Sequence, residues 1–235
     1  MKKYVLPLFT LLSLSSALRA EMYVGGGLGI ATLSEKRSMS ELNLNNPLQN
    51  TPLKDHYKAG SSNVAFKGLF GYRTQSDSFV YGGEFFLGYN ANKKEVSETV
   101  TATDTTNKSK LSQPCSMGIL GFGGYTYGDV TLLGKLGIGG QLFCFQWQEI
   151  DNTNGDSLTF KNRRLTPNLL LGLSAEMPVN QGMRLVADYT CALPVFKKDV
   201  TTKHQSVVNG DTWHTVQTAH NPTTHSFTLG ATFAF

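Results

Sequence analysis

The chain ends in the stretch His225-Ser226-Phe227-Thr228-Leu229-Gly230-Ala231-Thr232-Phe233-Ala234-Phe235. Counting back from the last residue, every second side chain is apolar, and the side chains between them are small or weakly polar. A period of two residues is typical of a β-strand with one apolar face. In a soluble protein such a strand would leave an unprotected apolar edge, whereas in a membrane barrel it closes the ring with its apolar face toward lipid. The terminal pattern therefore predicts a closing barrel strand, with an assembly signal made of Phe227, Leu229, Phe233 and Phe235.

The first 20 residues have the composition of a secretory signal peptide. A basic start is followed by an apolar run at 4–14 that is too short to span a bilayer, and small residues allow cleavage after either Ala17 or Ala20. Residues 21–235 are then expected to form one exported domain. In that domain no stretch reaches the roughly 18 uninterrupted apolar residues that a transmembrane helix requires.

Composition favours an all-β protein without an affinity for nucleic acid. The predicted signal segment holds three of the 21 basic residues and no acid, so 18 basic and 17 acidic residues remain. This balance gives no electrostatic support to a nucleic-acid partner. Twenty-four glycines against eight prolines, with many threonine and aromatic residues, are typical of a β-sheet protein.

Apolar alternation recurs along the chain and predicts eight strands. The expected strands are 22–32, 64–73, 79–90, 115–127, 130–148, 165–177, 183–195 and 226–235. Short turns alternate with four long polar segments, which we expect to be loops, at 33–62, 91–112, 151–162 and 197–223. For 91–112 an extended hairpin tip is the alternative.

The two strand faces differ sharply in chemistry, and this difference indicates where water and lipid lie. One face collects Phe, Leu, Tyr, Val and Ile, while the other collects Gly, Thr, Ser and charged residues. A lipocalin-like soluble barrel would place its polar face outside and an apolar pocket inside. Here the large apolar side chains share one face, and a small barrel with the charged face inside belongs in lipid. The sequence predicts an all-β fold: an eight-stranded antiparallel up-and-down transmembrane β-barrel with four long extracellular loops and short periplasmic turns.

These features resemble the OmpA-, OmpX- and opacity-like family of eight-stranded outer-membrane barrels. The resemblance covers residues 22–235 as a pattern of glycine–aromatic alternation, loop asymmetry and the terminal Phe235, behind a signal peptide. It implies a location in the bacterial outer membrane, contact with membrane lipid and lipopolysaccharide, and insertion by the barrel-assembly machinery. We expect no enzyme activity and no cofactor.

The inward faces carry six charges: Lys67, Glu84, Lys135, Glu176, Arg184 and Asp188. Side chains nearly fill an eight-stranded barrel, so buried charges there must pair. We expect a structural ion-pair network that plugs the lumen. A turn centred on Asn180 would place Glu176 directly opposite Arg184, and a turn between Ser76 and Asp77 would make Lys67 a diagonal neighbour of Glu84.

Other candidate chemistry is weaker. The late histidines, His204, His214, His220 and His225, match no zinc-binding spacing, so no metal site is expected. The arrangement His204-Gln205-Ser206 resembles that of lipid A deacylases, in which the histidine activates the serine. However, Val207 stands where that pattern has Asn, the closing strand lacks a Glu, and the pair falls in a predicted loop.

Three cysteines are present, and the position of one turn decides whether two of them can meet. With a turn centred on Asp129-Val130, Cys115 and Cys144 lie opposite each other and could form a disulfide. With a turn at Gly128-Asp129 they are only diagonal, and together with Cys191 they remain thiols.

The long polar segments are the expected carriers of function, because binding residues concentrate on loops held by a rigid scaffold. Adhesion, recognition of host or other surface ligands, and envelope integrity are the candidate roles. A lipid A-modifying enzyme using His204 and Ser206, or a narrow pore, is the alternative.

Overall fold

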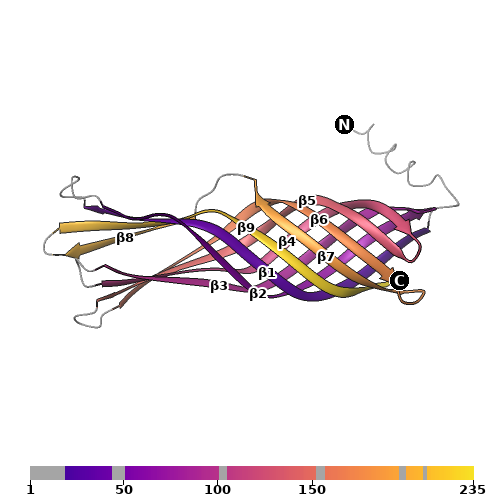
Figure 1. Ribbon diagram of the computed structural model, residues 1–235, viewed down its shortest axis with the longest axis horizontal. Helices are drawn as coiled ribbons and strands as arrows, with labels where there is room; N and C mark the ends of the chain where they lie inside the picture. The colour runs from indigo at the N-terminus through magenta and orange to yellow at the C-terminus, as the bar shows by residue number, and fades with distance from the viewer. Residues whose placement is uncertain (1–18, 44–50, 101–104, 152–156, 196–199, 209–210) are drawn as a thin grey trace, which may run out of the picture.

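The computed structural model describes residues 19–43, 51–100, 105–151, 157–195, 200–208 and 211–235 (Figure 1). The predicted signal peptide lies outside these ranges except for its last two residues, which begin the first strand. The nine strands are β1 (Arg19–Asn43), β2 (Thr51–Ser76), β3 (Phe79–Val100), β4 (Thr105–Tyr127), β5 (Val130–Asp151), β6 (Ser157–Pro178), β7 (Met183–Pro194), β8 (Val200–Val208) and β9 (Asp211–Ala234). None of the described residues belongs to a helix that is long and apolar enough to cross a membrane.

The strands form a closed antiparallel barrel of eight positions, as the sequence predicted. Each strand from β1 to β6 pairs with the next, β7 pairs with β9, and β9 closes the ring on β1. The extra strand β8 pairs with the part of β9 that extends beyond β7, so β7 and β8 share the seventh position.

The outward face of the barrel is apolar and the inward face is polar, which confirms the predicted alternation. Ile138 is 68% exposed and its outward neighbour Leu136 is 58% exposed, whereas the adjacent inward Lys135 is 5% exposed. We call the outward apolar side chains the apolar belt. It includes Leu28, Ile30, Phe66, Phe85, Leu87, Tyr89, Ile119, Leu136, Ile138, Leu165, Leu171, Leu173, Phe227 and Leu229.

The predicted long loops are wrong for most of their length, because the strands continue through them. The strand expected at 22–32 runs on to Asn43 and totals 25 residues, whereas about 9–11 residues are enough to cross a bilayer. Likewise, β3 and β4 stay paired from Asn92↔Gln113 to Val100↔Thr105, which confirms the extended hairpin that was the alternative for 91–112. Hydrophobic alternation marks a strand only where its two faces meet different surroundings, and that contrast fades where water reaches the outer face.

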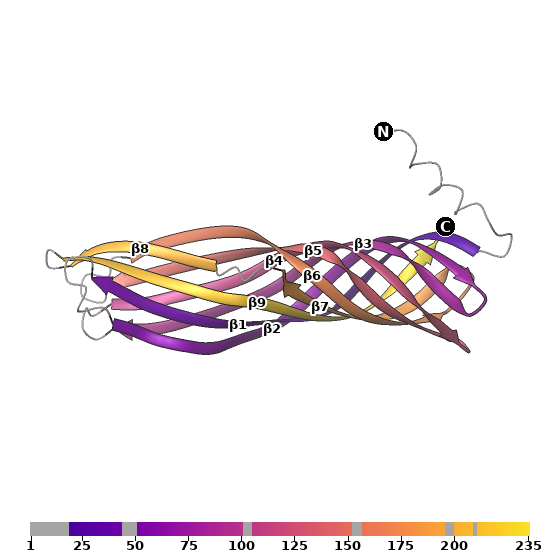
Figure 2. The ribbon, with the colours of Figure 1, turned by 90° about the horizontal axis from the view of Figure 1, so that it is seen from above.

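The extended strands separate into two sheets. Pairing between β2 and β3 ends at Ala65↔Asn90, and pairing between β6 and β7 ends at Asn168↔Pro194. Beyond these points the described strands form one sheet in the order β8-β9-β1-β2 and a second in the order β3-β4-β5-β6. Figures 1 and 2 show the strands running far past the barrel at the end opposite the C-terminus.

The short turns at the other end set the register of the barrel. The β4–β5 turn is Gly128-Asp129, and Gly128 adopts a φ of +58°, a conformation that glycine accepts without strain. Between β6 and β7, the Asn180 side-chain oxygen accepts hydrogen bonds from the backbone N–H groups of Gly182 and Met183 at 3.0 and 2.9 Å. This turn pairs Glu176 with Val186, so the predicted direct pairing of Glu176 with Arg184 is wrong.

Candidate functional site: the charged lumen

Four charges from four strands meet in the middle of the barrel. Asp188 accepts short contacts from Lys67 and Lys135, each at 2.7 Å. Glu84 lies 3.0 Å from Lys135 and 3.7 Å from Lys67. We call Lys67, Glu84, Lys135 and Asp188 the central network. It holds two cations and two anions and is balanced without any ligand.

Small neighbours on the inward face make room for these long side chains. Lys135 lies opposite Gly172, where an added Cβ would stand only 3.2 Å from the Cβ of Lys135. Gly71 lies opposite Glu84, and a Cβ at Gly71 would collide with the ring of Tyr23. Tyr23 in turn donates a hydrogen bond to the Glu84 carboxylate at 3.3 Å. The glycines of the inward pattern therefore allow charges from distant strands to meet.

A second group of charges closes the lumen nearer the short turns. Arg73 donates to Glu176 at 2.7 Å, and its Nε lies 3.5 Å from Glu21. Arg184 donates to Glu21 at 2.9 Å. We call Glu21, Arg73, Glu176 and Arg184 the lower network. All six charges singled out in the sequence thus take part in ion pairs, but Glu176 and Arg184 have partners other than each other. The predicted diagonal placement of Lys67 and Glu84 is also wrong, because Lys67 pairs with Gly88, although the two side chains still lie 3.7 Å apart.

Sequence reasoning missed Glu21 and Arg73, although a signal for both exists. Each flanks an outward apolar residue, Met22 and Tyr72 respectively, so strand alternation places both on the inward face. Arg73 is only 3% exposed, and a buried guanidinium requires an acidic partner. Counting every charge of inward parity would have included them.

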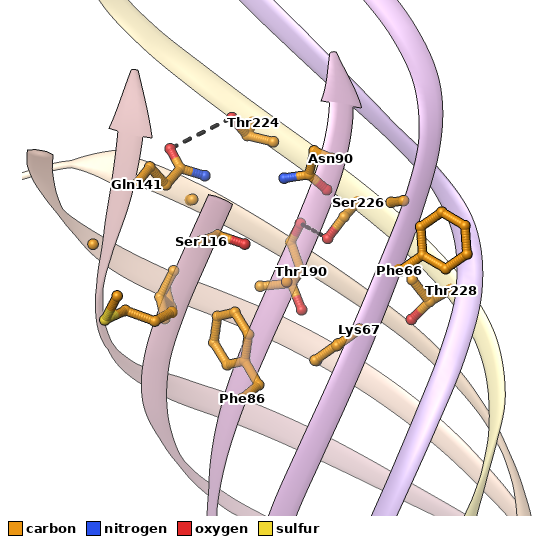
Figure 3. A pocket seen from close by; sticks show the side chains of 16 residues that line it. Phe66, Lys67, Phe86, Asn90, Ser116, Gln141, Thr190, Thr224, Ser226 and Thr228 are labelled. Carbon is orange, nitrogen blue, oxygen red and sulfur yellow. Dashed lines mark hydrogen bonds between the residues drawn. The ribbon is translucent and has the colours of Figure 1, made fainter. Parts of the chain in front are cut away.

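Beyond the central network lies a small cavity lined by both polar and apolar side chains (Figure 3). Its volume is about 30 Å³, measured as the space open to the centres of water molecules. Lys67, Asn90, Gln141, Thr190 and Thr224 contribute to its wall. At roughly 10–15 Å³ per water, this space holds two or three waters and excludes larger solutes.

An apolar cluster fills the interior beyond this cavity, where the sequence analysis expected polar residues. It consists of Leu33, Leu111, Phe143, Phe145 and Trp147, each at most 1% exposed. The three aromatic residues follow one another at a spacing of two on β5, which is the signal that could have revealed them. The interior is therefore closed at three levels: by the lower network, by the central network and by this upper cluster.

Comparison with known proteins identifies the family of this barrel. The model of the outer membrane protein beta-barrel domain family matches residues 4–235. The chain belongs to this family. Membership confirms the resemblance drawn from the sequence and assigns the protein to the bacterial outer membrane, with its apolar belt in lipid.

Solved structures of outer-membrane barrels resemble the chain only distantly. OprG from Pseudomonas aeruginosa matches with 12% identity and a TM-score of 0.49, covering 92% of this chain and 97% of that one. Neisserial surface protein A matches with 11% identity and a TM-score of 0.39, covering 92% and 99%. The attachment invasion locus protein Ail of Yersinia pestis matches with 13% identity and a TM-score of 0.33, covering 92% and 99%. No curated protein matches the sequence. Likenesses of this degree carry no information on function.

Assembly of the outer-membrane barrel supplies a first prediction. The backbone N–H of Phe235 donates to Met22 at 3.0 Å, beside the β9–β1 seam. If the terminal pattern is the assembly signal, deleting Phe235 should lower the amount of folded, heat-modifiable protein in outer membranes. Substituting Phe235→Tyr, which keeps a terminal aromatic ring, should preserve it. Equal amounts of folded protein with and without Phe235 would contradict the signal.

The cysteines of the barrel supply a second prediction. The observed turn pairs Cys115 with Leu142 and Cys144 with Ser112, and Cys115, Cys144 and Cys191 are free. We therefore expect a thiol reagent to label three groups in the unreduced, denatured protein, the same number as after reduction. Labelling of a single group without reduction would show a disulfide.

Of the remaining histidine and serine candidates, the structure describes the side chain of His225 but not those of the others. His204 and Ser206 lie on β8 rather than in a loop, which corrects one expectation, but their side chains lie outside the described residues, as do those of His214 and His220. On the outward face, Nδ1 of His225 and the Tyr189 hydroxyl form a hydrogen bond of 2.8 Å. Within the described ranges, no group of three or more His, Cys, Asp or Glu side chains could hold a metal ion.

Proposed function

We propose that this outer-membrane protein is a closed, non-conducting anchor that displays two extracellular sheets for binding at the cell surface. Adhesion and surface recognition are the roles that fit best. Envelope integrity is the alternative, in which the protein has a structural role in the membrane. The observation that carries the proposal is the contrast between the two halves of the molecule. The lumen is filled at three levels, while the strands continue to more than twice the length needed to cross the bilayer.

The filled lumen argues against a pore. Both networks are charge-balanced, so their side chains have no excess of one sign to attract a permeant ion. Their members span non-adjacent strands, as in the 2.7 Å contact between Lys67 on β2 and Asp188 on β7. Opening a channel would require separating these buried pairs, and a buried charge left without its partner is costly.

Conductance tests this part of the proposal. Purified protein in planar bilayers should show no steady, porin-sized conductance, whereas a general porin inserted under the same conditions should conduct. Heat-modifiable gel mobility of the same sample confirms that it is folded. A stable open level in the folded protein would refute the plugged barrel and favour a channel.

Hairpin excision tests the binding role. Lys36 and Lys58 are partners across β1 and β2, so residues 37–57 can be replaced by an Asn-Gly turn without changing the register below them. The barrel should still assemble, while cells bearing the variant should adhere less to epithelial layers and to sister cells. A second variant keeps the length of the hairpin but scrambles the residues of its tip. It shows whether adhesion depends on the sequence of the tip or only on the length of the hairpin. Unchanged adhesion in both variants would contradict a role for this hairpin.

A lipid A deacylase is not proposed. In the deacylase pattern a Glu of the closing strand orients the histidine, and β9 contains no Glu. Lipid A from cells with wild-type protein and with His204→Ala should therefore give the same mass spectrum as lipid A from cells without the gene. If lipid A lost one acyl chain in cells with the wild-type protein but not with His204→Ala, the result would favour the deacylase.

A further inference from the structure

The outer face of the second sheet, β3-β4-β5-β6, carries a concentration of positive charge outside the apolar belt. Its described outward side chains include five cations, Lys93, Lys108, Lys110, Lys161 and Arg163, and one acid, Glu95. We call these five cations the basic face. Residues 21–235 as a whole hold 18 basic and 17 acidic residues, so this excess is a local feature of one sheet and not a result of composition.

Strand register places these cations close together. One row of cross-strand partners runs Lys93–Ser112–Cys144–Arg163, and the next runs Glu95–Lys110–Gln146–Lys161. Neighbouring strands lie about 4.8 Å apart, and successive rows on one face lie about 7 Å apart. The basic face therefore covers a patch roughly 15 Å across, the size of a headgroup with more than one phosphate.

The basic face begins where the apolar belt ends. The last apolar row of the same four strands is Tyr89–Cys115–Leu142–Leu165, in which Tyr89 is 53% and Leu165 is 59% exposed. The row of Lys93 and Arg163 follows it, after a bulge in β4 at Pro114. A tyrosine at this boundary is typical of the aromatic girdle at the membrane interface. The cations thus stand at the level of lipid headgroups.

The cations crowd one another, and among the described outward side chains of this sheet Glu95 is the one acid beside them. A side-chain hydrogen bond with Lys93 is the main cause that lowers the pKa of Lys110, followed by partial burial and by the charges of Lys93 and Lys161. The charge of Glu95 raises the pKa of Lys110, but the net shift of this pKa is still downward. An anion bound between these ammonium groups would relieve this repulsion.

We propose that the basic face binds the phosphorylated headgroup of a glycolipid in the outer leaflet. Exposed cations bind a free phosphate weakly, but a headgroup held in the same membrane is present at a high effective concentration, and two phosphates on one sugar backbone engage several cations at once. A soluble sulfated polysaccharide would satisfy the same charges but would gain nothing from the adjoining apolar belt. This inference does not depend on the adhesive role or on the closed lumen.

Lysine labelling of the wild-type protein tests the site without mutation. The protein is reconstituted in nanodiscs of phosphatidylethanolamine, with or without bisphosphorylated lipid A, and acetylated; modification at Lys108, Lys110 and Lys161 is then measured by mass spectrometry. We expect at least threefold protection by lipid A, and no protection by dephosphorylated lipid A or by millimolar inorganic phosphate. Equal labelling with and without bisphosphorylated lipid A would overturn the proposal, and equal protection by inorganic phosphate would reduce the site to a simple anion site.

Charge substitution provides the second test. The triple variant Lys108→Gln, Lys110→Gln, Lys161→Gln should lower affinity for bisphosphorylated lipid A at least tenfold, while the matched triple change to arginine should retain it. Heat-modifiable mobility shows that both variants are folded, and both should remain non-conducting. Unchanged lipid A affinity in the glutamine variant would refute the site. Tight binding of heparin that is lost in this variant, with lipid A binding intact, would assign the basic face to a polysaccharide instead.

Discussion

Replacing Asp188 by asparagine is expected to destabilise the folded barrel by about 3–5 kcal/mol, because it leaves two buried lysines sharing one acid. Asp188 is 3% exposed and lies 2.7 Å from both Lys67 and Lys135. After the substitution the central network holds two cations and only Glu84. Asparagine keeps the shape of the side chain, so the loss reports charge rather than a cavity. Urea unfolding in lipid vesicles measures the free energy of unfolding.

A double-mutant cycle that combines Asp188→Asn with Lys135→Met measures how much of the destabilisation comes from the interaction between these two residues. The double variant retains Lys67 and Glu84, which lie 3.7 Å apart and balance each other. It should therefore be destabilised by clearly less than the sum of the two single changes. Thr190→Val, which removes a 3.1 Å hydrogen bond to Asp188 and no charge, is the control and should cost about 1 kcal/mol. Additive single effects would show that these groups do not act as one network.

Introducing arginine at Leu171 should destabilise the barrel by about 2–4 kcal/mol, the cost of a cation near the bilayer midplane. Leu171 lies on β6 within the apolar belt, 40% exposed, with Leu136 and Cys191 as its cross-strand partners. Its side chain therefore faces lipid, where an ammonium or guanidinium group loses its hydration. Equilibrium unfolding in vesicles again measures the effect.

The matched control places the same charge on the same strand outside the hydrocarbon core of the bilayer. Thr159 also lies on β6 and faces outward, but it belongs to the exposed extension beyond the belt. Thr159→Arg should change the free energy of unfolding by less than about 0.5 kcal/mol, as is usual for surface sites. If Thr159→Arg were as damaging as Leu171→Arg, the assignment of belt and extension would be wrong.

The sequence determined the membrane-embedded half of the protein through alternation. Strands such as 130–148 meet lipid on one side and a polar lumen on the other, and a period of two residues records that contrast directly. The same alternation placed Lys67, Glu84, Lys135 and Asp188 on the inward face. The sequence left two positions open for the β4–β5 turn, and the structure selects Gly128-Asp129, which separates Cys115 from Cys144.

Alternation was weak in most of the extensions, because water reaches their outer face and reduces the contrast, although the inward row Phe143, Phe145 and Trp147 on β5 keeps it. Strands β1 to β6 therefore run far beyond the expected boundaries. Cross-strand partners such as Lys110 and Gln146 could be assigned only from the register of the whole sheet. The basic face is for this reason a property of the tertiary structure, although each of its residues is visible in the sequence.

Tertiary structure alone decided which charges pair. Parity along a strand gives the side of the sheet on which a charge lies, but not its height in a barrel whose strands are tilted and staggered. A turn centred one residue later than expected moved Glu176 opposite Val186 and left its carboxylate to Arg73, 103 residues away in the chain. Lys67 meets Asp188 across 121 residues and between strands that are not neighbours. Such contacts depend on closure of the ring, which brings inward side chains together across the lumen, and no local pattern records it.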